Sequence, residues 1–374
     1  MKNVGIIGGG IGGVATAAAL HRFGIHATVY ERAPRLEEVG AGMMLWPNAT
    51  RVLETLELLD DVASRGGLNT HFLVRANCGK ILMNIALGKF DVPALCTRRS
   101  DLLESLLSAL PAEHIRLGRE FMHLEQSKSK VRVHFADGSV EEHDAVIGAD
   151  GIRSRVRTQL FGISDPVYRG YTVWRGIGAY DGSAIRRGHN SETWGPGSRF
   201  GILDLGQGRF TWYATANGPK RSTQPDERKN ELLQRFAAWH DPIPALIEST
   251  ESILENGAYD LPPLRHWTSG RVTLLGDAAH PCTPNLGQGG GMALEDAIVI
   301  AKCISSERSI DSGLRRYESL RRRRTRHIQQ RSLWMGHIGQ WQNRVVVAGR
   351  RAVTSLLPAA LFEHNLRRVY SYES

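Results

Sequence analysis

The sequence predicts an α/β protein: a Rossmann-like domain that carries an inserted, mostly antiparallel β-sheet and is followed by C-terminal helices. Three observations predict this fold class. A glycine-rich turn joins a strand to a helix at the start of the chain, residues 167–261 form a β-rich stretch with aromatic and Gly/Pro punctuation, and a long helical pattern follows residue 310. The 374 residues are enough for about two domains.

The first element is a βαβ unit with a glycine turn. The apolar run Asn3–Gly8 predicts a buried strand, Val14–Leu20 a helix, and Ala27–Glu31 a second strand. The turn has the spacing Gly8-x-Gly10-x-x-Gly13, which allows a tight turn, close approach of a pyrophosphate and close packing of the helix on the strand. Glu31 is placed to accept hydrogen bonds from an adenosine ribose. The unit predicts a bound dinucleotide, and it suits NAD and FAD equally.

Two later strands end in turns that contain glycine and an acid. The run Asp144–Ala149 leads into Asp150-Gly151, where the alternative is that Asp150 or Ser154 simply caps a helix. The run Arg271–Leu275 leads into Gly276-Asp277-Ala278-Ala279-His280.

A second glycine-rich loop, Gly287–Gly291, leads into a helix that we expect to begin near Met292, with Glu295 and Asp296 in its first turn. The N–H groups at such a helix start form a site for an anion or an electron-rich ring. The Lys-Ser/Thr ending of a triphosphate loop is absent, so no nucleotide triphosphatase is predicted.

The charge of the chain is concentrated in one segment. Lys and Arg number 47 against 38 Asp and Glu, a net charge of +9, and residues 310–350 hold ten Arg against two acids. The rest of the chain is close to neutral, which excludes a nucleic-acid surface spread over the whole fold. We expect the basic segment to be a solvated face of a long helix that reaches Trp341.

Composition excludes other classes. No apolar run approaches the ~18 residues of a transmembrane helix. The four cysteines are scattered without metal-ligand spacing, so we expect no metal and a reducing, cytoplasmic location.

Taken together, the three strand-end motifs resemble the fingerprints of single-component (group A) FAD-dependent aromatic hydroxylases, the family with the p-hydroxybenzoate hydroxylase fold. The resemblance covers roughly residues 1–345. Within the family, Trp46-Pro47-Asn48 and Pro284–Gly290 are most similar to the branch of urate hydroxylases, salicylate and 3-hydroxybenzoate hydroxylases, and zeaxanthin epoxidases.

The resemblance implies FAD as the cofactor and assigns its contacts. Residues expected at the adenosine, diphosphate and ribityl portions are Gly8, Gly10, Ile11, Gly13, Glu31, Arg32, Arg99 and Phe121. Residues expected nearer the ribityl chain and the flavin ring are Met44, Asp150, Gly151, Asp277, Pro284, Gly287, Gln288, Gly289 and Gly290. The N–H groups of the last loop would stabilise negative charge on reduced flavin.

The same resemblance divides the chain. We expect a discontinuous FAD-binding domain of residues 1–70, 99–165 and 262–342 and a β-sheet substrate domain of residues 71–98 and 166–261. A helical tail of residues 343–374 completes the chain. In this tail one helical face holds Val353, Leu356, Leu357, Ala360 and Leu361, which would pack on the domain, a second subunit or a membrane surface.

Seven residues of the β-rich stretch are candidates to face the substrate: Trp174, Arg175, Trp194, Arg199, Thr211, Trp212 and Tyr213. Ordinary sheet packing is the alternative for each. We assign Trp174, Arg199, Thr211 and Tyr213 to substrate binding. Resemblance to urate hydroxylases implies a substrate-binding arginine at Arg199, but Thr211 stands where those enzymes have tyrosine, so urate itself is not predicted. His280 looks structural, and no catalytic base is assigned.

The resemblance implies a monooxygenase that uses NAD(P)H as a transient co-substrate and O2 to hydroxylate a small aromatic or heteroaromatic compound through a flavin C4a-hydroperoxide. Two alternatives stay open: epoxidation of an alkene, and a non-catalytic flavin-binding redox module. We expect a monomer or homodimer with no nucleic-acid partner.

Overall fold

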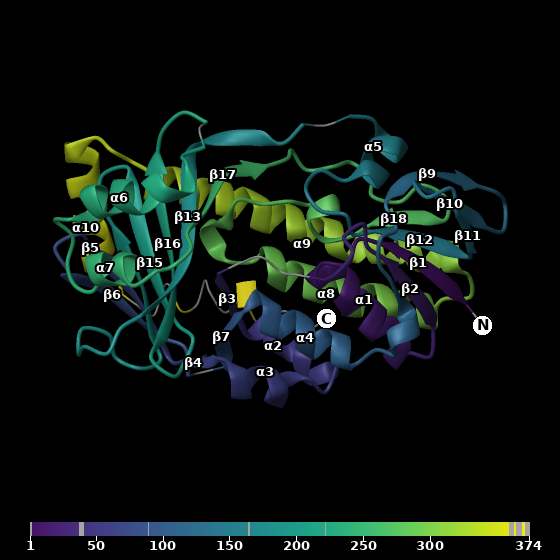
Figure 1. Cartoon of the computed structure of the whole chain (residues 1–374), viewed down its shortest axis with the longest axis horizontal. Helices are drawn as coiled ribbons and strands as arrows, with labels where there is room; N and C mark the ends of the chain where they lie inside the picture. Colours follow the sequence, from purple (N-terminus) through teal and green to yellow (C-terminus); the bar gives the residue numbers. More distant parts are fainter. Residues whose placement is uncertain are drawn as a thin grey trace.

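The computed structural model describes residues 2–36, 41–88, 90–163, 165–220, 222–358, 363 and 369–370. Two large sheets lie at opposite ends of an elongated molecule, and helices α8 (Gly289–Ser306) and α9 (Ile310–Gly339) run between them (Figure 1).

The N-terminal sheet has five parallel strands in the order β18-β12-β1-β2-β8. Their bounds are β1 Asn3–Ile7, β2 His26–Tyr30, β8 Ile115–Arg116, β12 Ala145–Gly148 and β18 Val272–Leu274. Helix α1 (Ile11–Arg22) covers one face, where a Cβ on Gly13 would lie 3.4 Å from Ile6. On the other face, Gly5 lies under the ring of His143 in a second, three-stranded sheet. That sheet has the order β11-β10-β9, with bounds β9 Phe121–Gln126, β10 Val131–Phe135 and β11 Val140–His143.

The second large sheet has seven strands in the order β17-β13-β16-β15-β14-β5-β6, all antiparallel neighbours except β14 and β5. Their bounds are β5 His71–Ala76, β6 Ile81–Ala86, β13 Val167–Ala179, β14 His189–Trp194, β15 Ser198–Asp204, β16 Arg209–Asn217 and β17 Leu254–Asp260. Helices α6 (Pro225–Phe236) and α7 (Ile243–Glu248) cover one face and form an apolar cluster with Trp174, Phe200 and Trp212.

The opposite face of this sheet turns towards the N-terminal half. Thr211 accepts a hydrogen bond from the backbone N–H of Gly42 over 2.9 Å, and the Tyr171 hydroxyl lies 3.2 Å from Asn285 Oδ1. Gly42 begins a small sheet of order β3-β7-β4, with bounds β3 Gly42–Leu45, β4 Gly67–Asn69 and β7 Ala94–Arg98. Residues 71–86 therefore join the seven-stranded sheet, whereas β7 pairs with β3 and β4.

The remaining helices connect these layers. Their bounds are α2 Pro47–Thr55, α3 Leu59–Arg65, α4 Arg99–Ser108, α5 Arg155–Phe161 and α10 Arg344–Leu356. Among the residues the structure describes, no helix is long and apolar enough to cross a bilayer.

Three sequence-based expectations about helices are wrong in detail. Helix α8 begins at Gly289 rather than near Met292, so its two acids lie in the second turn rather than the first. Helix α9 ends at Gly339, before Trp341. Its basic residues are not all solvated, because Arg321 is fully buried against the acids of α8.

The predicted apolar face of the tail is also arranged differently. Helix α10 buries Val347, Arg350 and Thr354, and leaves Val353 and Leu356 exposed. Ala360 and Leu361, which complete the predicted face, lie outside the described residues.

Candidate functional site

The first glycine motif forms a turn that leaves no room for side chains. Gly8 has a φ of +112°, and a Cβ on it would lie 2.5 Å from the Ala149 carbonyl oxygen. A Cβ on Gly13 would lie 1.9 Å from the Gly8 carbonyl oxygen. Gly10 caps α1 without a side chain and is exposed, so the N–H groups at this helix start are open to a phosphate.

Glu31 is held beside this turn at the end of β2. One carboxylate oxygen accepts a hydrogen bond from Gly9 N over 2.7 Å, and the other accepts from Ala33 N over 2.9 Å. Arg32 follows with an exposed side chain, as the adenine end would need. These residues fit the adenosine and diphosphate half of FAD, because the backbone supplies the phosphate site and the acid stands where a ribose would lie.

The second motif joins the first to the third. Asp150 Oδ2 accepts hydrogen bonds from two N–H groups at the start of α5, and Ser154 caps the same helix. Both capping alternatives are therefore real, and they leave Asp150 Oδ1 buried with no hydrogen-bond partner among the described residues. Arg157 donates to the Ala278 carbonyl oxygen over 2.9 Å, which ties this segment to the turn after β18. The Phe121 carbonyl oxygen is already engaged, since it accepts from Arg155.

The third motif brings Asp277 and the second glycine loop together. A Cβ on Gly289 would lie 4.0 Å from Asp277 Oδ1, and a Cβ on Gly290 would lie 2.3 Å from Met43. The Asp277 side chain is exposed to solvent. The protein atoms around its carboxyl nevertheless raise the pKa of this group, and the nearby His280 and Arg99 oppose that rise.

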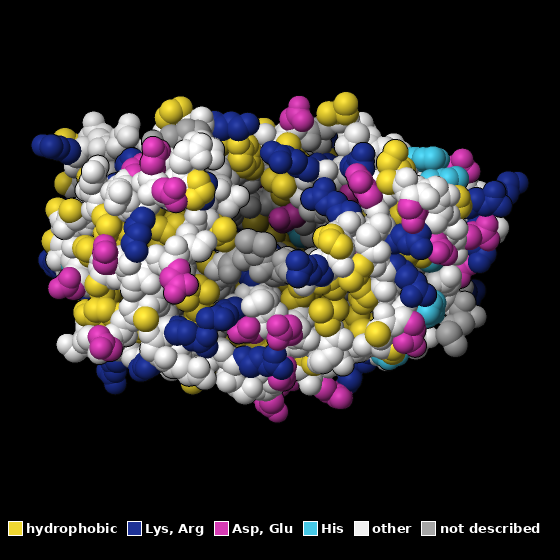
Figure 2. Space-filling view, viewed as in Figure 1, with side chains coloured by type: hydrophobic (Ala, Val, Ile, Leu, Met, Phe, Trp, Pro, Cys, Tyr) yellow, Lys and Arg dark blue, Asp and Glu magenta, His cyan; other side chains and the backbone are white. Residues whose placement is uncertain are grey.

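The loop before α8 closes over the strand that contains Met44. A short turn at Pro284–Leu286 is followed by Gly287 in the left-handed region, with a φ of +60°. A Cβ on Gly287 would lie 3.3 Å from the Trp46 ring nitrogen. Figure 2 shows a hollow between the two halves of the molecule with Lys and Arg side chains around its rim.

Helix α8 is anchored beneath this loop by a buried ionic cluster. Asp296 lies 2.5 Å from His280 Nε2 and 2.6 Å from Arg321 Nε. Burial alone would raise the pKa of Asp296, but His280 and Arg321 lower it to about 2. His280 is thus held by a carboxylate, in agreement with its structural assignment.

The neighbouring acid extends the cluster to the other side of the loop. Glu295 accepts from Asn48 over 2.7 Å and pairs with Arg321 and Arg324 over 2.5 Å each. Asn48 also donates to Gln288 in the glycine loop over 3.0 Å. Arg321 and Arg324, which belong to the basic segment of α9, therefore neutralise the acids beneath the Gly287–Gly291 loop.

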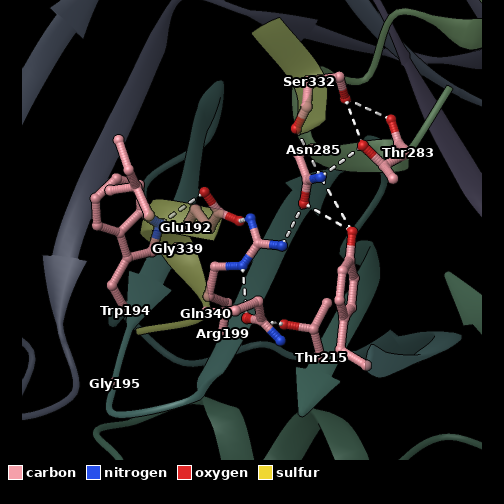
Figure 3. A network of polar contacts seen from close by, with 12 residues as sticks. Glu192, Trp194, Gly195, Arg199, Thr215, Thr283, Asn285, Ser332, Gly339 and Gln340 are labelled. Carbon is pink, nitrogen blue, oxygen red and sulfur yellow. Dashed lines mark hydrogen bonds and ion pairs between the residues drawn. The ribbon is translucent and has the colours of Figure 1, made fainter. Parts of the chain in front are cut away.

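Arg199 lies in a second buried network, on the seven-stranded sheet (Figure 3). Its guanidinium donates to Glu192 over 3.1 Å, to Gln340 over 3.1 Å and to Asn285 over 2.5 Å. The Trp194 ring nitrogen donates to the second oxygen of Glu192 over 2.8 Å. Arg199 therefore links β15 to the end of α9 and to the turn before the glycine loop, and its donors face protein acceptors.

A row of paired residues crosses four strands beside this network. Arg175 pairs with Tyr213, Tyr213 with Gly201, and Gly201 with Glu192, so all four positions share one face of the sheet. A Cβ on Gly201 would lie 2.1 Å from the Tyr213 ring, which shows that the ring lies over the glycine towards Glu192. Thr211 lies on β16, two residues before Tyr213 and on the same face of the sheet, and it contacts β3.

Tyr213 and Arg175 differ in their partners. Burial and the charge of Glu192 raise the pKa of Tyr213 well above its usual range. Burial also lowers the pKa of Arg175, and repulsion by Arg99 lowers it further. No residue that the structure describes forms a hydrogen bond or an ion pair with the Arg175 guanidinium.

The structure separates Trp174 from the other predicted substrate residues. Its side chain points to the α6–α7 face and packs with Phe200 and Trp212, away from Arg199. Sequence reasoning missed Glu192, Asn285 and Gln340, the three partners of Arg199. The alternation of side chains along β14 offered one signal for Glu192, because it places Glu192 on the same face as the candidate Trp194.

A parallel sheet with a backbone-built dinucleotide cradle, facing an antiparallel sheet with buried polar side chains, defines a single-component flavoprotein hydroxylase. The chain belongs to the family described as FAD binding domain, which matches residues 1–332. The resemblance that the motifs predicted is therefore confirmed.

Named relatives agree with this family. The chain is 38% identical to "Aurachin C monooxygenase/isomerase" of Stigmatella aurantiaca, over 97% of this chain and 96% of the relative. It is 33% identical to "2-heptyl-3-hydroxy-4(1H)-quinolone synthase" of Pseudomonas aeruginosa, over 95% of this chain and 94% of the relative. The crystal structure of Klebsiella pneumoniae HpxO with FAD and uric acid superposes with a TM-score of 0.93 at 26% identity, covering 99% of this chain and 97% of that one. The protein is an FAD-dependent monooxygenase, so the alternative of a non-catalytic flavin-binding redox module is wrong.

Proposed function

We propose that this monooxygenase hydroxylates a nitrogen heteroaromatic ring that carries an N–H donor and an oxygen acceptor, as a 4(1H)-quinolone does. The overall reaction would consume the substrate, NAD(P)H, one proton and O2, and would release the hydroxylated product, NAD(P)+ and water. The row Arg175–Tyr213–Glu192 on the flavin-facing sheet is the observation that carries the proposal.

Tyr213 would accept the N–H of the substrate. Its own proton would be directed at Glu192, and its raised pKa keeps that proton in place at neutral pH. The lone pairs of the phenol oxygen are then free to accept a hydrogen bond from the ring N–H. As oxygen transfer draws electrons from the ring, this hydrogen bond would strengthen, because the N–H becomes more acidic.

Arg175 would donate to the substrate oxygen. A guanidinium that no described carboxylate pairs, and that the charge of Arg99 repels, favours an anionic or strongly polar oxygen beside it. Positive charge at this position stabilises the enolate-like oxygen that forms when the N–H proton is shared with Tyr213.

Arg199 would then be a positioning residue. It pairs with Glu192 and so holds this carboxylate in place on the face of the sheet that it shares with Tyr213. It also holds Asn285, and through it the start of the loop that faces the flavin. Thr211, against Gly42, would shape the wall rather than bind a polar group of the substrate.

When bound, FAD would supply the redox chemistry by which NAD(P)H and O2 deliver one oxygen atom to the substrate. We assign its adenosine and diphosphate half to the Gly8–Gly13 turn, Glu31 and Arg99. Asp277 and the loop Pro284–Gly290 would hold the ribityl chain and ring. The closed sheet above this loop would exclude water from the reacting atoms.

Two named relatives support this substrate class. The quinolone named for the Pseudomonas enzyme carries an N–H, a 4-oxo group and a 3-hydroxyl. The uric acid bound to HpxO also presents N–H groups beside carbonyl oxygens.

The test is NAD(P)H consumption with 2-alkyl-4(1H)-quinolones, their N-methyl analogues, urate and salicylate, followed by mass analysis of products. We expect the N–H quinolones to accelerate NAD(P)H oxidation and to gain one oxygen atom, with the N-methyl analogues about tenfold slower. Turnover of salicylate with no response to any N–H heteroaromatic compound would overturn the proposal. Product analysis also separates a hydroxyl from an epoxide.

We further infer a cytoplasmic enzyme that acts as a monomer or homodimer. Four free cysteines suit a reducing compartment, where NAD(P)H is available. Sedimentation velocity would report the oligomeric state directly.

A further inference from the structure

Helix α10 is amphipathic, but its polar side faces the protein and its apolar side faces outward. The side chains that it buries against the protein include Arg350 and Thr354, and those that it exposes are almost all apolar. Val345 is 80% exposed and Leu356 is 81% exposed. Exposed residues with helical spacing form one stripe, here called the α10 face: Val345, Val346, Gly349, Ala352, Val353 and Leu356.

The reversed orientation is built into the packing. Arg350 donates to the carbonyl oxygens of Ile338 and Gly339 at the end of α9 and to that of Gly195. Its guanidinium also lies over the Trp194 ring, 5.0 Å from the centroid. These contacts fix which side of α10 faces inward, so the apolar stripe remains outside.

The surroundings of the α10 face are basic. No Asp or Glu occurs in the sequence between Glu318 and Glu363. Arg344 is exposed at the start of the helix, and the exposed Lys80 precedes β6, the edge strand against which α10 packs. Ile81 on that strand adds a further exposed apolar side chain.

We propose that the α10 face binds the surface of an anionic lipid bilayer, with the apolar stripe among the acyl chains and the basic residues at the headgroups. An exposed apolar helix face with basic neighbours is the combination that holds amphipathic helices in the membrane interface. The proposal does not depend on the substrate assigned above, since it uses none of the residues of that site.

Area and charge both disfavour a second copy as the occupant. The 13 residues of α10 span about 20 Å, and a stripe about 10 Å wide covers roughly 200 Å², against about 800 Å² per partner in a stable dimer. A second copy carries the same basic residues around its α10 face, whereas the anionic headgroups of a bilayer attract Arg344 and Lys80.

The test uses the full-length, FAD-loaded protein and sedimentation with vesicles of phosphatidylcholine, with and without phosphatidylglycerol. We expect affinity for the anionic vesicles to exceed that for neutral ones about tenfold and to fall as salt rises. The double variant Val353→Asp/Leu356→Asp should lose about tenfold in affinity for anionic vesicles, with an unchanged flavin spectrum.

Ile163→Asp is the matched control, because Ile163 is 83% exposed and lies just beyond α5, at the other end of the molecule. It should bind vesicles as the unmodified protein does. The proposal is overturned if the unmodified protein stays in the supernatant, or if Ile163→Asp loses as much affinity as the double variant. It is equally overturned if sedimentation velocity shows a dimer that the double variant abolishes.

Discussion

Two neighbouring regions of the seven-stranded sheet each contain an arginine, the buried Arg199 and the half-buried Arg175, and they differ in what faces the guanidinium. Around Arg199, donors and acceptors from β14, the turn before α8 and the end of α9 form a complete set (Figure 3). Around Arg175, the described residues provide another arginine and two tyrosines but no carboxylate.

This difference distinguishes Arg199, whose charge has a structural role, from Arg175, whose charge we propose binds a ligand. Removing one partner of a buried ion pair is strongly destabilising, because it leaves an uncompensated buried charge, so such a pair holds elements together. A half-buried cation that no described residue pairs is unfavourable in the free protein, and we infer that a ligand supplies the missing charge. Four variants would break or sharpen this comparison.

Arg199→Met should have the largest effect, a loss of about 3–5 kcal/mol in the free energy of unfolding, because Glu192 would be left charged and buried without its partner. Urea unfolding of the FAD-loaded protein measures it. The double variant Arg199→Met/Glu192→Gln should recover part of the loss. Unchanged stability of the single variant would show that the network is not structural.

Arg175→Met should leave stability unchanged or slightly raised, because it removes a half-buried charge that no described residue pairs. We expect kcat/KM for N–H quinolones to fall about 100-fold, or about 2.7 kcal/mol, since the donor to the substrate oxygen is lost. Steady-state kinetics and urea unfolding on the same preparation check both halves. A large loss of stability with normal kinetics would place Arg175 in the same class as Arg199.

Asp296, in the cluster under the glycine loop, gives a test by pH. Its folded pKa of about 2 lies below the ~3.9 of an unfolded aspartate, so its pairing contributes about 2 kcal/mol that is present above pH ~4 and is lost as the pH falls towards 2. Asp296→Asn should remove this part of the acid dependence, measured as the urea midpoint at several pH values from 4 to 2. Parallel curves for the two proteins would contradict the assignment.

Tyr213→Phe should have the smallest effect. We expect kcat/KM for N–H quinolones to fall about tenfold, or about 1.4 kcal/mol, because one neutral hydrogen bond to the substrate is removed. The N-methyl analogues, which cannot make that bond, should be unaffected and serve as the internal control. An equal loss for both substrates would mean that Tyr213 acts through packing alone.

The glycine turn that we assign to the cofactor could be predicted because its geometry is local and built from backbone. The spacing of Gly8, Gly10 and Gly13 between a strand and a helix already implies the turn, since only glycine allows that approach of the main chain. Errors arose where distant segments meet. Glu295 and Asp296 suited a first helical turn by sequence, whereas in the fold they neutralise arginines of α9.

The polar face of the seven-stranded sheet, which we propose binds the substrate, could not be predicted in the same way. Strand alternation shows that Arg175, Tyr213, Glu192 and Arg199 each lie on one of two faces, but only strand register decides which residues become neighbours. The partners of Arg199 come from positions 7, 86 and 141 residues away in the chain.

The amino-acid sequence by itself therefore determined the fold class, the dinucleotide cradle and the family, because these rest on short glycine-rich patterns whose geometry is set within a few residues. The tertiary structure decided that Arg199 is paired whereas no described residue pairs Arg175, and which side of α10 faces outward. Those properties depend on charges and surfaces brought together from distant parts of the chain.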